Sequence, residues 1–404
     1  MTRLELRYGS TLGLLLLITL APLARAQTPP ACSSLPNVVY MQVGDTQEPL
    51  MKALGQKLRA NTPNPITIVY KTAGSCTNID ALYHGVKLTT NPSYVPSADE
   101  DPAWDPSKPA PACTIDAAGV DVDIGVSATF VDSCDTSTPP SGIRLFTGPL
   151  QAYVFAVPKA SSQKAITAEE GYFTFGFGMA GGVEPWTSES LMAIRPPTKS
   201  TVLTLAAAIG VPASKWKGVP LDTSSQVVSA LTTPGSEEGR IGILGAEIYD
   251  KNRDRLKALA FRAFDQRHAY YPDSTAIAFD KQNVRDGHYT PWSPTVYIAH
   301  VDSMGRVTNP LARYLIGLIT FKNVTPAPSF DPLATAIGVN LIPDCAMKVT
   351  RSFEGGDLSL YSPAEPCECF YESKIGTLPS SCESCTDDGP CGAGKCRHGY
   401  CEAR

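Results

Sequence analysis

Short apolar runs of strand type alternate along the chain with segments in which apolar residues recur at helical spacing. The runs 37–43 (NVVYMQV) and 66–72 (ITIVYKT) are rich in β-branched residues, as buried strands are, and 46–61 lies between them with helical periodicity. A second helix is expected over 76–86 and a third strand over 122–128 (VDIGVSA). Because strand–helix–strand alternation needs crossover connections, the pattern predicts a parallel sheet with helices on its faces.

The middle of the chain repeats this scheme. The segment 88–114 interrupts it, since it is rich in Pro, Ser and Asp and shows no periodicity, which predicts a long surface insertion clamped by Cys113. Regular periodicity fades after about residue 344. The further strands are expected within 149–161, 190–196, 239–250 and 293–301, and the further helices within 167–178, 200–210 and 309–321.

Residues 1–26 have the pattern of a secretory signal peptide: a basic start, a short apolar core and small residues before Gln27. The apolar core is shorter than the roughly 20 residues that span a bilayer, so we expect cleavage rather than anchoring. The remaining chain of about 380 residues is long enough for two or three domains. Its net charge of −5 gives no indication of a nucleic-acid partner.

The twelve cysteines are an even number, and export makes disulfides the expected state. Four lie in the body of the chain and eight in the C-terminal part, and the pairing cannot be deduced from their spacing. A Cys-x-x-Cys pair at Cys382 and Cys385 is also compatible with a zinc site, but oxidation competes with metal for every thiolate. We therefore expect a small disulfide-rich module, with no metal and no cofactor.

Three segments share one design, in which a strand ends in a turn of small or hydroxyl-bearing residues that begins a helix. They are Gly44–Gln47, Gly74–Thr77 and Arg195–Thr201. First helical turns present unpaired N–H groups and a positive dipole end, so several of them converging with one arginine can bind a tetrahedral oxyanion. Taken singly, each is an ordinary helix cap, and Lys199 is either a second positive charge or a solvated side chain.

The order of these segments resembles the phosphate-type, type II periplasmic substrate-binding proteins, which are the solute receptors of ABC transporters. The similarity covers about residues 35–325 and depends on VGDTQEPLMKALGQKL, YKTAGSCTNIDALYHG, VDIGVSATF and AIRPPTKST, with EEGRIGILGAEIYD supporting the fold. The resemblance implies a small oxyanion held between two lobes and an ABC permease as partner. The ligand-binding residues that it implies are Thr46, Gln47, Gly74, Ser75, Ser127, Arg195, Ser200 and Thr201.

Two departures from the family pattern fall at the expected ligand. The family's Asp after the strand serine, which accepts a hydrogen bond from protonated phosphate, is Ala128 here. The spacing from Arg195 to the following serine is one residue longer, and Lys199-Ser200-Thr201 stands where the family has Ser-Gly-Thr. An acceptor aspartate rejects fully deprotonated anions, so its loss removes that discrimination. Phosphate, a sulfate-like anion, an organic ligand and no ligand all stay open.

We predict an α/β fold of the two-lobed, type II periplasmic binding protein class with a small disulfide-rich C-terminal module. Lobe one is expected to comprise 33–150 and 290–345, lobe two 151–289, and the cysteine-rich tail 346–404. The two lobes would be joined by crossing strands. A ligand held between them would then favour a closed state through hinge motion.

The function that we predict is that of a periplasmic or secreted, non-catalytic binding protein for phosphate or a related oxyanion. The alternative is an extracellular or envelope interaction protein that keeps this fold, has lost the ligand and contacts a partner through its tail. The eight-cysteine tail and the insertion at 88–114 favour that alternative, because a transport receptor needs neither. An extracellular hydrolase ranks last, since the sequence contains no nucleophile elbow, zinc-protease helix or P-loop.

Overall fold

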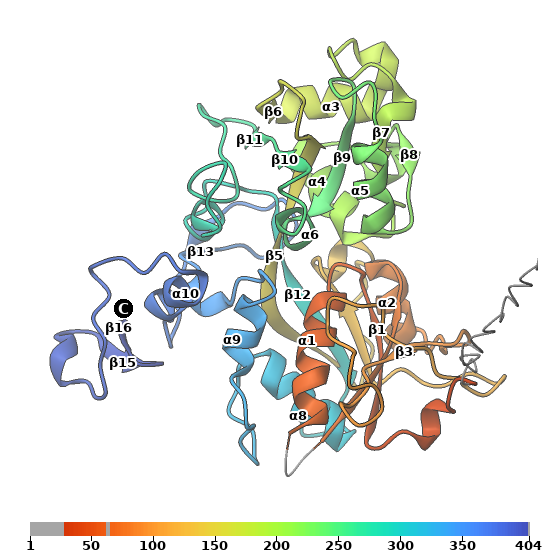
Figure 1. The fold of residues 1–404 in the computed structure, drawn as a ribbon, viewed down its shortest axis with the longest axis vertical. Coiled ribbons are helices and arrows are strands. Elements are labelled where there is room, and N and C mark those ends of the chain that lie inside the picture. The colour runs from red at the N-terminus through yellow and green to blue at the C-terminus, as the bar shows by residue number, and fades with distance from the viewer. Residues whose placement is uncertain (1–27, 62–64, 403–404) are drawn as a thin grey trace, which may run out of the picture.

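The computed structural model describes residues 28–61 and 65–402, so the expected signal peptide lies outside the described residues. Two α/β lobes, one below the other in Figure 1, are followed by a tail that lies beside the lower lobe. Within the described ranges, no helix combines the length and apolar character needed to cross a membrane.

A path of hydrogen-bonded strands runs through both lobes in the order β3-β2-β1-β4-β12-β5-β9-β7-β8, with β10 paired to β5. In lobe one, β1 pairs in parallel with β2 and with β4, as the strand–helix alternation predicts. The buried side chains of these strands form the core of the lobe together with α1 and α8. The elements of lobe one are β1 (Val38–Val43), α1 (Glu48–Arg59), β2 (Thr67–Thr72), α2 (Ser75–Tyr83), β3 (Ser93–Tyr94), β4 (Ile124–Ser127), α8 (Pro310–Ile319) and α9 (Pro332–Ile337).

Lobe two is built on β7 and β9, which pair in parallel. Its helices begin and end where local sequence dictates: a capping box of Thr167 and Glu170 starts α3, and Gly210, with φ of +70°, ends α4. The elements of lobe two are β6 (Ala165–Thr167), α3 (Ala168–Phe177), β7 (Met192–Ile194), α4 (Ser200–Ile209), β8 (Val219–Pro220), α5 (Ser224–Thr232), β9 (Ile241–Gly245), α6 (Ala246–Asp250), β10 (Leu256–Ala258), β11 (Ala260–Arg262) and α7 (Gln282–Arg285).

Two antiparallel strands, β5 (Ile143–Pro158) and β12 (Trp292–His300), connect the lobes (Figure 1). The first part of β5 pairs with β12 in lobe one, and its later part pairs with β9 in lobe two. Gly148 of β5 makes room for the Tyr297 ring of β12, because a Cβ there would be 2.5 Å from that ring. The lobes are thus joined by two neighbouring strands.

The prediction of a surface insertion at 88–114 is wrong for part of that segment. Residues of β3 pair antiparallel with β2 and extend the sheet, and Val95 and Trp104 pack into the core of lobe one. The Cys32–Cys113 disulfide clamps the segment. A non-periodic run of residues therefore contributes an edge strand and core side chains.

The tail contains a β13 (Val349–Thr350) and β14 (Ser359–Leu360) hairpin, α10 (Glu368–Ile375), and a β15 (Lys395–Arg397) and β16 (Tyr400–Glu402) hairpin. All twelve cysteines are paired in six disulfides, two of which lie in lobe one and four in the C-terminal part.

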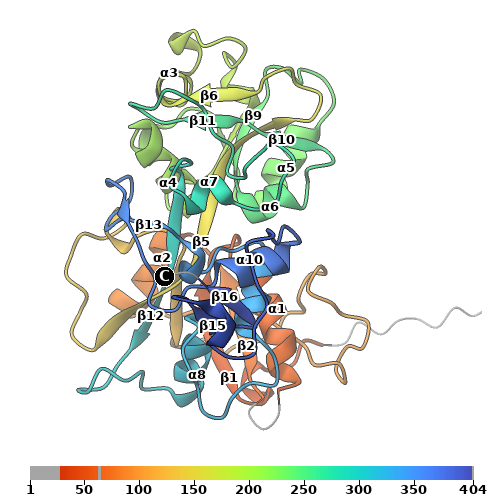
Figure 2. The same cartoon turned by 90° about the vertical axis from the view of Figure 1, so that its left-hand side faces the viewer.

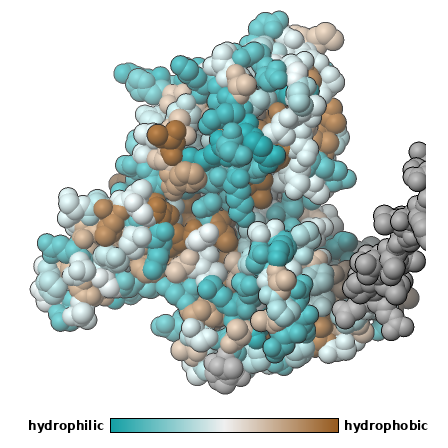
Figure 3. Space-filling model, in the orientation of Figure 1, coloured by the Kyte–Doolittle hydropathy of each residue, from teal (hydrophilic) through white to brown (hydrophobic). Residues whose placement is uncertain are grey.

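Apolar residues gather on the visible face over α10 and the adjoining lobes (Figure 3). The predicted fold class, two α/β lobes with a disulfide-rich C-terminal module, is confirmed.

Residues 346–361, which we call the interlobe strap, contain no cysteine and pack across the junction of the two lobes (Figure 2). On lobe one, the Thr129 hydroxyl donates a hydrogen bond of 2.6 Å to Glu354 Oε2. On lobe two, Gly355 lies against α4, because a Cβ at this glycine would be 3.1 Å from the Cβ of Ala207. The interlobe strap is therefore a third connection between the lobes.

Arg351 holds the middle of the interlobe strap on β12. Its guanidinium lies over the Trp292 ring, 4.3 Å from the centroid, and donates hydrogen bonds to the carbonyls of Thr290 and Trp292. The same guanidinium pairs with Glu354 at 3.2 Å. Both charged side chains are buried, so this pair links the crossing strand to the contact with lobe one.

Candidate ligand site between the lobes

Arg195, which follows β7 in lobe two, is buried at the lobe junction with 1% of its surface exposed. Its Nη2 donates to Asp45 Oδ1 of lobe one at 2.9 Å, and its Nη1 donates to Ser224 Oγ at 2.7 Å. Its Nε has no hydrogen-bond partner in the part of the chain that the structure describes. The predicted anion-binding arginine therefore pairs with a carboxylate of the protein itself and keeps one N–H unpaired.

Asp45 lies in the turn between β1 and α1, and its carboxylate reaches across to lobe two. Asp45 Oδ2 accepts hydrogen bonds from the Ser224 N–H at 2.9 Å and the Ser224 hydroxyl at 2.8 Å, at the first turn of α5. The ammonium of Lys199 lies 3.8 Å from Oδ1. Burial raises the pKa of Asp45, but Arg195 and Lys199 outweigh it, so the pKa is lowered overall and Asp45 is ionised.

The two lobes are also in direct contact at the N-terminus of α2. A Cβ on Gly74 would be 2.5 Å from Thr198 Oγ1, and the Cys76 N–H donates to the Thr198 carbonyl at 3.3 Å. Ser75 Oγ accepts a hydrogen bond of 3.2 Å from the Ala128 N–H. Gly74 is thus needed for close approach of the lobes, and one N–H of this helix end is paired with the opposite lobe.

Ser127 ends β4 with its side chain engaged in its own turn. Its hydroxyl donates to the Thr129 carbonyl at 2.8 Å. The next residue, Ala128, is buried, and its carbonyl accepts a hydrogen bond from the Tyr153 hydroxyl of β5. The turn after β4 is therefore tied to Tyr153 of β5 through its backbone.

A chain of side-chain amides connects α1 to β5 at the junction. Gln47 Nε2 donates to Gln151 Oε1 at 3.0 Å, and Gln151 Nε2 donates to the Thr46 carbonyl at 3.3 Å. Among the described residues, Thr46 Oγ1, Gln47 Oε1 and Thr201 Oγ1 are buried without a hydrogen-bond partner. Buried polar atoms are rarely left unpaired, so these three atoms are candidates for ligand contacts.

The eight residues predicted from the sequence are all buried, and their segments meet where the lobes join. A pocket of about 470 Å³ opens elsewhere, between α8, α9 and the tail, and contains none of them. The candidate site is therefore closed to solvent, and the role of these residues as ligand contacts stays a prediction.

Glu247, at the start of α6, is a residue of the candidate site that sequence reasoning missed. It is 1% exposed, and neither of its carboxyl oxygens has a hydrogen-bond partner within 28–61 and 65–402. Burial raises the pKa of Glu247 to about 8 and outweighs the opposing effect of the Gln151 side chain, which lies nearby but makes no hydrogen bond of normal geometry to either oxygen. The carboxyl is thus neutral at pH 7. The available signal was an acidic residue two positions after an apolar strand.

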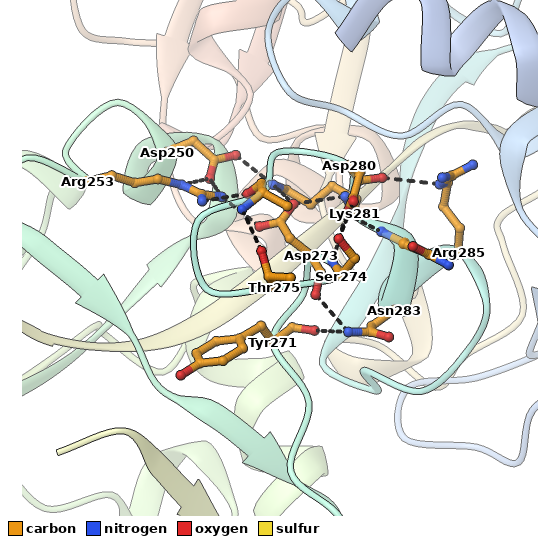
Figure 4. A network of polar contacts seen from close by, with 12 residues as sticks. Asp250, Arg253, Tyr271, Asp273, Ser274, Thr275, Asp280, Lys281, Asn283 and Arg285 are labelled. Atoms are coloured by element: carbon orange, nitrogen blue, oxygen red, sulfur yellow. Dashed lines mark hydrogen bonds and ion pairs between the residues drawn. The ribbon is translucent and has the colours of Figure 1, made fainter. Parts of the chain in front are cut away.

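A buried ion network fixes the end of α6 three residues beyond Glu247 (Figure 4). Lys281 Nζ lies 2.8 Å from Asp250 Oδ2 and 2.8 Å from Asp273 Oδ1, and Arg253 contacts the same two carboxylates. Because both cations are paired with both anions, the network is electrostatically balanced and holds α6 in place.

Sequence reasoning also missed Asp45, Gln151, Tyr153 and Ser224. Asp45 stands in a turn that the sequence singled out, next to two predicted residues. Ser224 follows Thr223, whose side chain forms a capping box with Gln226 at the start of α5. A capping box marks a helix N-terminus in sequence, and this signal could have added α5 to the candidate helix ends.

Replacing Glu247 with glutamine is expected to stabilise the protein at alkaline pH and to leave stability unchanged near pH 4. Because the folded-state pKa of about 8 exceeds the usual 4.5, the carboxyl favours folding below pH 4.5, and this contribution is lost as pH rises to about 8. Urea unfolding of both proteins across this range should show a difference that grows by about 1.4 kcal/mol per pH unit. The exposed Glu365 provides the matched control, and a difference independent of pH would contradict the expectation.

No protein-family model matches the chain, and no curated protein matches it. Solved structures of similar fold include a substrate-binding protein from Clostridium perfringens with bound phosphate, at 14% identity and TM-score 0.49, covering 76% of this chain and 99% of that one. An ABC-type phosphate transport receptor from Vibrio cholerae has 12% identity and TM-score 0.47, covering 75% and 99%. The reduced OxyR regulatory domain from Pseudomonas aeruginosa has 10% identity and TM-score 0.37, covering 69% and 95%. These likenesses concern the fold alone.

Proposed function

We propose that the protein is an exported, non-catalytic solute-binding protein that holds a small oxyanion of the phosphate type between its lobes. The observation that carries this proposal is a buried arginine at the lobe junction, Arg195, whose Nε is unpartnered among the described residues. The hydroxyl groups of Thr46 and Thr201 are also buried, and neither has a hydrogen-bond partner among the described residues. They would supply further donors. Oriented donors and a guanidinium are the groups that recognise oxyanions.

The predicted contacts divide between the lobes. Lobe one would contribute Thr46, Gln47, Gly74, Ser75 and Ser127, and lobe two Arg195, Ser200 and Thr201. Ligand binding would favour the closed arrangement, because one ligand then contacts both lobes. Export is supported by six disulfides, which persist in oxidising compartments. An ABC permease is the partner that belongs to this proposal.

The second candidate function is an extracellular or envelope interaction protein without a ligand. It is favoured by one specific observation: Asp45 pairs with Arg195 and with the first turn of α5, where an oxyanion would otherwise be held. Under this candidate, the Asp45 carboxylate permanently occupies the hydrogen-bond donors that a bound oxyanion would otherwise use. The partner of such a protein would bind the disulfide-rich tail.

Calorimetric titration with phosphate, sulfate and methanesulfonate distinguishes the two candidates. Under the first, at least one anion binds, and Thr201→Val lowers its affinity by about tenfold because one buried hydrogen bond is lost. Thr335→Val on α9 is the matched control, since its hydroxyl bonds to the Asp331 carbonyl away from the junction. No binding of any anion by the unmodified protein would favour the second candidate.

A further inference from the structure

Glu247 reaches the lobe junction because of where β9 ends. Gly245, the last residue of β9, pairs with Tyr153 of β5, whose hydroxyl bonds to Ala128 of lobe one. The carboxyl folds back over this strand end, since a Cβ on Gly245 would be 2.3 Å from Glu247 Oε1. Both carboxyl oxygens are buried and lack a hydrogen-bond partner among the described residues. A polar group in this position needs a partner when the site is filled.

We propose that Glu247 contacts the ligand as a neutral carboxylic acid and makes the interlobe site selective for singly charged oxyanions. The inference rests on the proposed function and adds to it a ligand charge and a selectivity residue. A neutral carboxylic acid can donate its proton to an oxyanion and accept a hydrogen bond from a ligand hydroxyl. Such a group would reach the ligand from lobe two.

The charges at the junction set the ligand charge. Arg195 and Lys199 contribute two positive charges, and Asp45 contributes one negative charge. With Glu247 protonated, these three groups together carry a net charge of +1, which a singly charged anion neutralises. Nearby Lys251 and Asp222 are exposed to solvent, and Asp250 is paired with Lys281. A doubly charged anion would leave a net negative charge in a buried environment, and buried unpaired charge is costly.

Ionisation of Glu247 would weaken anion binding in two ways: the site would lose its net positive charge, and the ligand would lose a donor. Burial raises the pKa of Glu247 to about 8, so the loss falls in the alkaline range. The other charged or titratable groups that interact with this carboxyl are Asp250 and Lys251 of α6, Asp45 of lobe one and Tyr153 of β5. Because the ligand binds the protonated form, its affinity stays constant below pH 7 and decreases above pH 8.

The test is calorimetric titration of the full chain with methanesulfonate and with sulfate between pH 6 and pH 10. These probes share a tetrahedral sulfur centre, differ in charge, and do not titrate in this range. The unmodified protein should bind methanesulfonate more tightly than sulfate at pH 6. Its methanesulfonate affinity should decrease about fivefold from pH 8 to pH 9. Glu247→Gln keeps a neutral hydrogen-bonding side chain at every pH. The affinity of this variant for methanesulfonate should therefore not decrease from pH 8 to pH 9.

A measurement on the unmodified protein serves if Glu247→Gln does not fold. At pH 8 to 9, titrations in buffers of different ionisation enthalpy should show proton uptake on methanesulfonate binding. Absence of uptake, or a pH dependence that persists in Glu247→Gln and so belongs to Lys199, would overturn the inference while leaving the proposed function intact. Tighter binding of sulfate at pH 6 would overturn the charge selectivity. If neither the two probes nor phosphate binds at pH 6, the proposed function fails, and the inference fails with it.

Discussion

Replacing Asp45 with alanine is expected to make the stability of the protein depend on oxyanions in solution. The substitution removes the carboxylate that pairs with buried Arg195 at 2.9 Å and accepts two hydrogen bonds from Ser224. Removing one member of a buried pair leaves an uncompensated charge, which costs about 3–5 kcal/mol. A sulfate or phosphate ion offers the same acceptor atoms, so it can take the place of the carboxylate. At a hundredfold excess over its Kd, such an ion restores about 2.7 kcal/mol.

Urea unfolding of Asp45→Ala in sulfate and in chloride, at matched ionic strength, measures this effect. Sulfate stabilises most proteins without binding to a site, so the quantity to compare is the gain relative to the unmodified protein. Asp121→Asn is the matched control, because this lobe-one carboxylate is 84% exposed and lies 3.6 Å from the Lys87 ammonium. Equal gains in all three proteins would show that Asp45 does not stand where an anion binds.

Replacing Arg351 with alanine is expected to detach the interlobe strap and to lower the free energy of unfolding by about 3–5 kcal/mol. The loss has two sources. Glu354 would remain buried without its cation, and the Trp292 ring would lose the guanidinium that lies 4.3 Å from its centroid. The lobes should then separate more readily, because one of three connections is released.

Small-angle scattering and hydrogen exchange separate the two consequences of Arg351→Ala. We expect a larger radius of gyration and faster exchange at 128–130 and 290–292. Thr129→Val removes the hydrogen bond of the interlobe strap to lobe one and keeps the Arg351–Glu354 ion pair. It should therefore also speed hydrogen exchange at these segments, while lowering the free energy of unfolding by only about 1 kcal/mol. Arg306→Ala, which removes an exposed ion pair with Asp302, should cost less than about 1 kcal/mol. Unchanged exchange in both strap variants would contradict a tethering role.

The features predicted correctly from the sequence depend on neighbours in the chain. Alternating strand and helix periods determine the parallel pairing of β1 with β2 and β4, and a glycine after an apolar helix marks the end of α4. The candidate helix ends were found in the same way, because a hydroxyl before a helix is a local signal. The expected signal peptide and the even number of cysteines were enough to predict disulfides, though not their pairing.

The features that the sequence did not reveal depend on contacts between distant residues. Asp45 and Arg195 are 150 residues apart, and nothing near either one indicates the other. Glu247 looks like any acidic residue after a strand until its burial is known. The interlobe strap and the edge strand at 93–94 show no period of their own, since their side chains pack against several elements at once. Periodicity detects one buried face and misses a segment with several.

The interlobe strap also bears on how fast a ligand can enter and leave. The two neighbouring strands β5 and β12 would by themselves allow the lobes to rotate about one hinge axis. The interlobe strap contacts both lobes through Glu354 and Gly355, so it would oppose that rotation. A site between the lobes would then become accessible when the interlobe strap is released. Exchange of any ligand would then follow one opening rate, the same for different anions. Ligands of very different affinity would share a slow, concentration-independent step in binding.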